Sequence, residues 1–335
     1  MGDDDGRGAA QSGESYLVNG VKMIRGTGSP RGTAALKRHF ASLVDSVQAS
    51  EHRFPDGAHF RIEIPSVENP AALRAVIEES RALKVPIHRT SQGSGAMLLT
   101  RAELNEMAVI GADEGLEVSL FVGPREEYGV GGSVRSPDGM SLAGQLRGLD
   151  QLRYAIDDIS RAVDAGIRGF LIPDRGLLQL VNAMVDSGEL PASIVWKISA
   201  VLAPSNPISF RQLVDMGGTT INVPSDVTLV ELAELRAASD APIDLYLEAP
   251  DGLGGMVRGN ELAEIATVAA PLYAKFGLRN ARMVYPAGEQ NVGDVVANVR
   301  EKVRRGALAL EFLEASSVDL TTSKPGAEGI GVPEP

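Results

Sequence analysis

Apolar and polar positions along this chain follow two alternating periods, and the change from one period to the other recurs about eight times. Short stretches with a period of two are typical of β-strands, whereas the stretches between them place apolar residues at the helical period of 3.6. The eight predicted strands cover residues 60–64, 85–90, 117–122, 169–172, 194–199, 220–223, 243–248 and 281–285.

Signals for helix ends support this alternation. Thr100 and Glu103 form a capping-box pattern where one helical stretch begins, and Thr228 and Glu231 form another. Glycine, which readily takes the left-handed conformation that ends a helix, follows three predicted helices, at Gly115, Gly166 and Gly277.

Eight strand–helix units with short returns predict a closed (β/α)₈ TIM barrel with an extra N-terminal helix over residues 33–48 and loosely ordered termini. An open doubly wound sheet is the alternative, but the Gly-x-Gly-x-x-Gly turn that usually follows its first strand is absent. We expect a flexible N-terminal tail over 1–31, the barrel over 32–316 and a flexible C-terminal tail over 317–335. The pattern resembles the general (β/α)₈ enzyme superfold, which implies an enzyme but no particular reaction.

Composition narrows the classes of function. The 44% of hydrophobic residues suffices for a sizeable core, and a net charge of −12 argues against nucleic-acid binding, which relies on Lys and Arg. No stretch approaches the ~20 apolar residues of a membrane span, and no signal-peptide pattern opens the chain. The absence of cysteine excludes disulfides, thiolate metal sites and cysteine nucleophiles. We expect a cytoplasmic protein with a small-molecule substrate and no nucleic-acid or membrane partner, and the composition is compatible with a homo-oligomer.

Polar residues recur on one alternate face of several predicted strands. Between residues 243 and 248 the odd positions are apolar, and the even positions carry Asp244, Tyr246 and Glu248. Parallel strands that are dry on both faces read as continuous apolar runs, so polar residues aligned on one face indicate a functional interior.

Lys197 is the most distinctive residue predicted to face the interior, because the chain has only seven lysines. A buried lysine must be paired or have a lowered pKa, and a lowered pKa is what a general base or an imine-forming nucleophile needs. Glu63 and Glu248, from the first and seventh strands, would lie near each other as general acid and base. With Tyr246 they complete the candidate catalytic set. The alternative interpretation is a structural ion pair between Lys197 and one of the two glutamates.

Residues predicted to bind substrate face the interior or line the loops at the carboxyl ends of the strands, where barrels carry their chemistry. They are Arg61, Arg89, Gln92, Asn222, Asp244, Gly254, Gly255 and Arg258. The loop 91–95 is either a backbone cradle or a tight connection, and the glycine loop after the seventh strand is suited to a phosphate or carboxylate. The loop 123–148 is longer than a compact barrel needs, and it is typical of a lid, a disordered insertion or an oligomer contact.

Three functions follow from these residues. The first is a metabolic enzyme of the lyase, aldolase or isomerase kind, acting on a small polar, anionic metabolite (carboxylated, phosphorylated or sugar-like) by acid–base or lysine-assisted chemistry. The second is an isomerase or hydrolase that depends on Mg²⁺ or Mn²⁺, although no cofactor is certain. Its candidate ligands are Glu63, Glu248, Asp174 and His88. The third is a non-catalytic, ligand-binding barrel.

Overall fold

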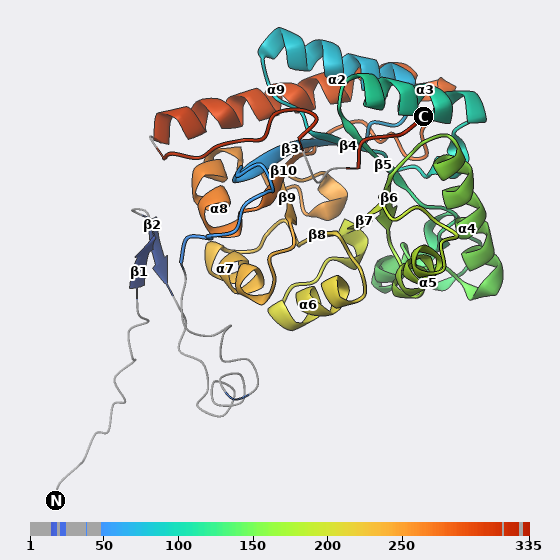
Figure 1. Cartoon of the computed structure of the whole chain (residues 1–335), viewed down its shortest axis with the longest axis horizontal. Coiled ribbons are helices and arrows are strands. Elements are labelled where there is room, and N and C mark those ends of the chain that lie inside the picture. Colours follow the sequence, from blue (N-terminus) through green and yellow to red (C-terminus); the bar gives the residue numbers. More distant parts are fainter. Residues whose placement is uncertain (1–14, 19–20, 25–37, 39–47, 317, 328–330) are drawn as a thin grey trace, which may run out of the picture.

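Eight parallel strands close into a barrel in the computed structural model, which describes residues 15–18, 21–24, 38, 48–316, 318–327 and 331–335. The order of the strands around the barrel follows the chain, and the last strand pairs with the first (Figure 1). The barrel strands are β3 (Phe60–Pro65), β4 (Arg89–Ser91), β5 (Glu117–Phe121), β6 (Gly169–Ile172), β7 (Val195–Ile198), β8 (Thr220–Asn222), β9 (Ile243–Glu248) and β10 (Leu272–Phe276). The predicted TIM barrel is confirmed.

Helices surround the barrel strands (Figure 1). In the described part of the chain they are α2 (Pro70–Leu83), α3 (Arg101–Asp113), α4 (Gly148–Asp164), α5 (Arg175–Asp186), α6 (Pro207–Asp215), α7 (Leu229–Ala238), α8 (Leu262–Ala269) and α9 (Val292–Ser316). The capping boxes predicted at Thr100 and Thr228 are both present. Gly115 and Gly166 take left-handed backbone angles after α3 and α4, as predicted.

The outward-facing strand residues and the inner faces of the helices form one continuous apolar core. It includes Ile62 and Ile64 of β3, Leu120 of β5, and Leu245 of β9, all fully buried. Alternate residues on the same strands point into the barrel and are mostly polar, so the period of two separates a dry outer core from a charged interior. None of the described helices is long and apolar enough to cross a membrane.

The eighth strand is β10, and its prediction over residues 281–285 is wrong. Those residues lie in the loop before α9, whereas residues 272–276, which had been assigned to the preceding helix, form the strand. Helix α8 ends at Ala269, one residue before the Ala270–Pro271 bond. Because proline disfavours helical geometry in the residue before it, Pro271 was the signal that the helix had ended. Gly277 consequently follows a strand and does not end a helix.

A β-bulge near the end of β9 changes the direction of Glu248. Lys275 of β10 pairs with Tyr246, but the next residue, Phe276, pairs with Glu248, so that Leu247 is the extra residue. Phe276 faces the surrounding helices, and Glu248 therefore points to the same side. The alternation that predicted an inward Glu248 fails at this bulge.

The described part of the C-terminal segment packs against the amino-terminal end of the barrel, unlike the loosely ordered tail that was expected. Thr322 forms a β-bridge with Phe60, the first residue of β3. The backbone N–H of Gly326 donates to the carbonyl of Gly115 at 2.8 Å, just before β5. Main-chain hydrogen bonds therefore hold this segment in place.

At the other end of the chain, β1 (Ser15–Val18) and β2 (Val21–Ile24) form an antiparallel pair. The rest of the predicted N-terminal tail, and the extra helix over residues 33–48 apart from positions 38 and 48, lie outside the described residues.

Candidate functional site

Six charged side chains occupy the centre of the barrel, where this fold usually has apolar layers. Each of the six is at most 1% exposed, and three acidic residues face three basic ones, so that their formal charges balance. We call this group the ionic cluster: Glu63, Arg89, Glu117, Lys197, Asp244 and Lys275. An unpaired charge is costly to bury, and each of these charges has opposite charges around it.

Arg89 lies in the middle of the ionic cluster. Its Nε donates to Oε2 of Glu63 at 2.8 Å, and its Nη2 donates to Asp244. Its Nη1 donates to Oγ1 of Thr220 at 3.1 Å and lies 3.4 Å from Oε1 of Glu117. Arg89 therefore directs its donors at the protein's own side chains, which differs from the substrate-binding role predicted for it.

Glu63 is the acidic residue on which three cations converge. Its Oε2 accepts from Arg89 and Lys197, while its Oε1 accepts from the Ser91 hydroxyl at 2.7 Å and lies 3.7 Å from Nζ of Lys275. Burial opposes its ionisation, but the three positive charges outweigh burial and hold the pKa of Glu63 well below its usual range. Glu63 is therefore a fixed anion and a poor candidate for a general acid.

Lys197 belongs to the ionic cluster, as the structural alternative for this residue predicted. Its Nζ donates to Glu63 and lies 3.3 Å from Oδ2 of Asp244. Burial, reinforced by the charge of Arg89, lowers the pKa of Lys197 to about 7 against the attraction of the two carboxylates. Carboxylate oxygens on two sides make this amine an ion-pair partner.

Lys275 is a second interior lysine, which the sequence did not reveal because its strand was misplaced. Its Nζ donates to Oδ1 of Asn222, lies 4.0 Å from the centre of the Tyr246 ring, and lies 3.7 Å from Oε1 of Glu63. Burial lowers the pKa of Lys275, while the nearby carboxylates oppose the shift. This amine thus has two uncharged neighbours and one carboxylate at 3.7 Å, whereas Lys197 contacts two carboxylates.

The surroundings of Lys275 lie at the carboxyl ends of the strands. Ser91 and Asn222 are the last residues of β4 and β8, and Lys275 is next to last in β10. Asn222 donates its Nδ2 to the carbonyl of Ile198 at 2.6 Å, which turns its Oδ1 towards Lys275. Burial raises the pKa of Tyr246 well above its usual range, so its phenol stays protonated. We call Ser91, Asn222, Tyr246 and Lys275 the carboxyl-end tier.

Glu248 does not join Glu63 inside the barrel, which corrects the predicted pair of carboxylates. Its Oε1 accepts from the backbone N–H of Arg279 at 3.0 Å, and its Oε2 lies 3.3 Å from Nε of Arg305 on α9. The bulge in β9 thus places this carboxylate between the barrel wall and a helix, where it supports the loop after β10.

Arg61 and Gln92 are also occupied by neighbouring groups. Arg61 lies at the amino-terminal end, where its Nε donates to Oγ of Ser323 at 2.8 Å and its Nη1 to the hydroxyl of Tyr273 at 3.2 Å. Gln92 closes its own loop, with bonds of 3.0 and 3.2 Å to the carbonyl and N–H of Gly95. Neither side chain has the position predicted for a substrate contact.

Arg258, the cation predicted to assist anion binding at the glycine loop after β9, is already bonded to neighbouring groups. Arg258 is 4% exposed, and it donates to the carbonyl of Val227 at 2.7 Å and to Glu261 at 2.9 Å. Gly254 and Gly255 have positive φ angles of 95° and 62°, which suit glycine and form the turn. Arg258 therefore joins two loops to each other.

The four predicted metal ligands are far from forming one site. Both ring nitrogens of His88 bond main-chain groups, and Asp174 caps α5 by accepting from the N–H of Leu177 at 3.0 Å. Glu63 and Glu248 lie on different sides of the barrel wall. The described residues contain no group of three or more His, Asp or Glu that is arranged to hold an ion.

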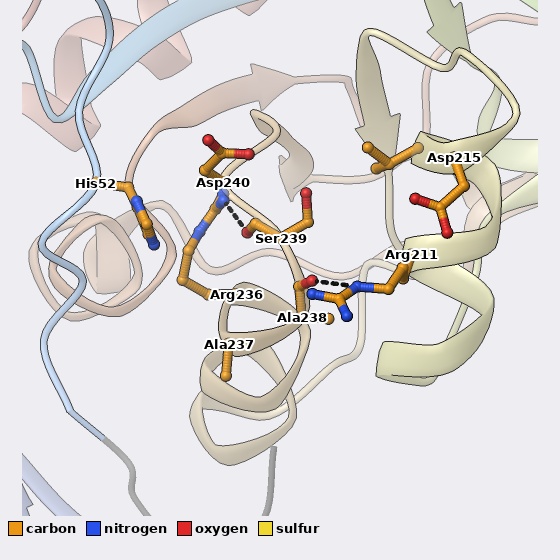
Figure 2. Close-up of a pocket in the computed structure, with 9 residues that line it drawn as sticks. His52, Arg211, Asp215, Arg236, Ala237, Ala238, Ser239 and Asp240 are labelled. Carbon is orange, nitrogen blue, oxygen red and sulfur yellow. Dashed lines mark hydrogen bonds between the residues drawn. The ribbon is translucent and has the colours of Figure 1, made fainter. Parts of the chain in front are cut away.

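A surface pocket of about 570 Å³ lies at the opposite end of the barrel, beside the ends of α6 and α7. Figure 2 shows two of its arginines bonded to main-chain carbonyls: Arg211 to Ala238 at 2.9 Å and Arg236 to Ser239 at 2.8 Å. Its lining includes no residue of the ionic cluster or the carboxyl-end tier. Since barrel enzymes work at the carboxyl ends of their strands, the tier around Lys275 is the candidate active site.

Similar solved structures include a putative fructose-1,6-bisphosphate aldolase from Coccidioides immitis, 12% identical, with a TM-score of 0.43, covering 77% of this chain and 91% of that one. The native KDPGal structure is 10% identical, with a TM-score of 0.42 and coverage of 78% and 99%. The U32 peptidase Mk0906 is 17% identical, with a TM-score of 0.39 and coverage of 60% and 73%. Such similarity carries no argument about the reaction. No protein-family model and no curated protein matches this chain.

Proposed function

We propose that this barrel is an enzyme of the lyase or aldolase kind that uses Lys275 to form an imine with a small carbonyl substrate. The setting of the Lys275 amine carries the proposal: it is 1% exposed, lies at the carboxyl end of β10 and contacts Asn222 and Tyr246. A lysine attacks a carbonyl only in its neutral form, and burial increases the neutral fraction by lowering the pKa.

Lys275 is favoured over Lys197, the original candidate, because of their different partners. Two carboxylates stabilise the charged form of Lys197 and occupy the space around its Nζ. Lys275 has an amide oxygen and an aromatic face as its near neighbours, and among the described residues only Glu63 supplies a carboxylate within 4 Å. In this proposal Lys197 keeps Glu63 ionised and in place, and acts as a positioning residue.

The proposed reaction begins when the neutral Lys275 amine attacks the carbonyl carbon and forms a carbinolamine. The hydroxyl takes up a proton and leaves as water, and the protonated imine that results accepts electrons from the bond between the α and β carbons of the substrate. As that bond breaks, the hydroxyl on the β carbon gives its proton to water and the β carbon departs as a carbonyl product, while the electron pair of the bond forms an enamine. The enamine is protonated on the α carbon, and water hydrolyses the resulting imine to release the second carbonyl product and regenerate Lys275. Tyr246, whose phenol stays protonated, borders the amine and would donate a hydrogen bond to the departing hydroxyl.

The charge of the ionic cluster supports this chemistry. With Lys275 neutral, the formal charges of the cluster are three negative and two positive, although burial raises the pKa of Glu117 and so reduces the negative excess. When Lys275 forms a protonated imine, its nitrogen carries a positive charge, and three formal positive charges again face three negative ones. Coulomb attraction in a dry interior is strong, so the cluster would stabilise the imine relative to the neutral carbinolamine.

Borohydride trapping tests the proposal directly. The full chain would be incubated with pyruvate or with dihydroxyacetone phosphate, then reduced and digested, and the adduct would be located by mass spectrometry. We expect a single adduct on Lys275 with at least one of the two carbonyl probes. Lys302 is the matched control, because it is also buried, with a pKa lowered to about 8 by burial, but it lies on α9 and donates to the carbonyl of Pro65.

An adduct on Lys197 in place of Lys275 would move the nucleophile to the ionic cluster and overturn the residue assignment. Labelling of Lys302 equal to that of Lys275 would show non-specific reactivity. No adduct with either probe would reject the imine mechanism and favour the non-catalytic, ligand-binding barrel.

A further inference from the structure

Arg125 is a buried cation at the carboxyl end of the barrel that the proposed chemistry does not yet use. It follows β5 and opens the long loop over residues 123–147. Its guanidinium carbon lies 4.0 Å from the centre of the Phe121 ring and 4.5 Å from that of Tyr128, and its side chain is only 5% exposed. The two rings hold the guanidinium in a defined plane.

One edge of this guanidinium has no hydrogen-bond partner among the described residues. Nε donates to Glu127 at 2.7 Å, while Nη2 donates to the carbonyl of Gly93 at 2.9 Å and to the hydroxyl of Tyr128 at 3.0 Å. Nη1 is buried and makes no hydrogen bond to any of the described residues. A buried donor without a partner is destabilising, and cation–π contacts do not satisfy its N–H groups.

The loop after β4 attaches Arg125 to the mouth of the barrel. Glu68 accepts from the backbone N–H groups of Gly93 and Ser94 at 2.8 and 2.9 Å, which fixes the strand-end loop from the opposite side. Tyr285 packs so closely on Gly93 that a side-chain carbon there would lie 2.5 Å from its ring. Arg125 and Tyr285 thus both contact the same loop above the carboxyl-end tier.

A second unmatched polar group lies on the same wall of the barrel. Ser119 of β5 pairs in register with Ser91 of the carboxyl-end tier, so it also faces the interior, and its Oγ is buried without a partner among the described residues. The guanidinium of Arg125 lies over the ring of Phe121, which is two residues further along β5. Two buried polar groups without a hydrogen-bond partner among the described residues therefore lie on β5 and directly after it.

We propose that Nη1 of Arg125 binds the anionic group of the substrate, a carboxylate or a phosphate, while the carbonyl end reaches Lys275. This assignment deepens the proposed function and rests on it for the reacting end only. An oxyanion would accept both free N–H bonds of Nη1, and charge-assisted bonds to arginine are among the stronger ones.

The negative charge of the acidic groups around Arg125 is too weak to exclude an additional anion. Glu127 is the carboxylate bonded to Arg125, and its side chain is 42% exposed, so solvent screens much of its charge. Glu126 is paired with Arg147 at 3.2 Å. Burial raises the pKa of Glu68 despite its hydrogen bonds, which weakens the negative charge on the far side of Gly93.

Calorimetric titration of the full chain with inorganic phosphate and with succinate tests the site and separates the two kinds of anion. We expect one of the probes to bind, and Arg125→Met to weaken that binding at least tenfold. Glu127→Gln removes a competing charge and should tighten binding about two- to threefold, in the opposite direction. Arg135→Met is the matched control, since Arg135 is exposed in the same loop and, within the described part of the chain, donates only to the carbonyl of Gly129. The affinity of this variant should equal that of the unaltered chain.

The proposal is overturned if the unaltered chain binds neither anion, if Arg125→Met binds as tightly as the unaltered chain, or if Arg135→Met weakens binding as much as Arg125→Met. Should Arg125→Met unfold, the effect of Glu127→Gln on anion affinity tests the proposal in its place. Because Glu127 is half-exposed, this replacement should leave the fold intact, and an affinity that does not rise would overturn the proposal. Trapping with the uncharged probe glyceraldehyde separates this inference from the proposed function. Arg125-dependent anion binding without any Lys275 adduct would reject the imine chemistry and keep the anion site.

Discussion

The buried polar groups at the two ends of the barrel differ in how completely they are hydrogen-bonded. At the amino-terminal end, Arg61 and His88 are bonded to Ser323 of the C-terminal segment. At the carboxyl end, the amine of Lys275 contacts two uncharged groups and lies 3.7 Å from a single carboxylate oxygen, and Nη1 of Arg125 has no partner within the described chain. Polar groups with complete hydrogen bonding hold a structure together, whereas incompletely bonded ones can gain free energy from a ligand. We infer from this difference that the amino-terminal end contributes mainly to stability and that the carboxyl end is the candidate site of the reaction.

The largest expected effect is loss of carbonyl trapping when Lys275 is replaced. Lys275→Met removes the proposed nucleophile, so the rate of adduct formation should fall more than about 10³-fold. Lys197→Met should leave Lys275 reactive and change the rate far less, although it should lower stability. Adduct yields, measured by mass spectrometry beside circular dichroism spectra, compare the variants. If both variants fold and lose adduct formation equally, the proposed difference in role between Lys275 and Lys197 is wrong.

The ionic cluster should control stability more than any surface ion pair does. Arg89→Met leaves three buried carboxylates short of a partner, and breaking such a group should lower the free energy of unfolding by about 3–5 kcal/mol. Arg74→Met, which removes an exposed pair with Glu106, should cost less than about 1 kcal/mol. Urea-induced unfolding measures both. A small cost for Arg89→Met would show that the cluster adds little to stability.

His88 makes the stability of the amino-terminal end depend on pH. Its Nδ1 accepts from the N–H of Ile62, so the ring proton is on Nε2, which donates to the carbonyl of Ser323. Burial lowers the pKa of His88 from 6.5 to about 4. The unfolded chain therefore takes up a proton at pH values where the folded chain does not. The contribution of His88 to the free energy of unfolding is complete above pH 6.5. It is lost as the pH falls towards 4, and the total change is about 3 kcal/mol.

Replacement by glutamine isolates this contribution. The difference in unfolding free energy between the unaltered chain and His88→Gln, measured by urea titration at several pH values, should change steadily between pH 6.5 and 4. A difference that stays constant over this interval would show that His88 titrates normally.

The smallest predicted effect concerns one hydroxyl of the C-terminal segment. Ser323→Ala removes the acceptor for Nε of Arg61, and an unmet buried donor should lower the unfolding free energy by about 1–2 kcal/mol. Ser187→Ala, in an exposed turn after α5, is the control and should stay within about 0.5 kcal/mol of the unaltered chain. If the two variants are equally stable, the segment does not contribute to the stability of this end.

The barrel could be predicted from the sequence because its signals are local. Periodicity, capping residues such as Thr100 and left-handed glycines such as Gly115 depend on a few neighbouring residues, and seven of the eight strands were correctly located by them. The eighth was missed because the apolar residues after α8 continue its pattern. Only Pro271 marks the boundary, and the error concealed Lys275.

The candidate site was less predictable because it depends on contacts between distant parts of the chain. Alternation correctly placed Glu63, Asp244 and Lys197 inside, yet it could not reveal that their charges cancel. The bulge that redirects Glu248 is a property of pairing with β10 and has no counterpart in the local pattern. The position of Arg125 over Phe121 likewise depends on how a long loop folds back.

The pairing of the last strand with the first has a consequence for how the chain is made. One edge of β3 stays unpaired until β10, more than two hundred residues later, has left the ribosome. An open strand edge is a template for pairing with other chains, so the nascent protein passes through a long stage in which it is prone to aggregate. The segment that follows α9, synthesised after β10, then covers the starts of β3 and β5. A pause in translation before β10 is complete would therefore reduce the yield of folded protein, because it prolongs the stage in which the edge of β3 is open.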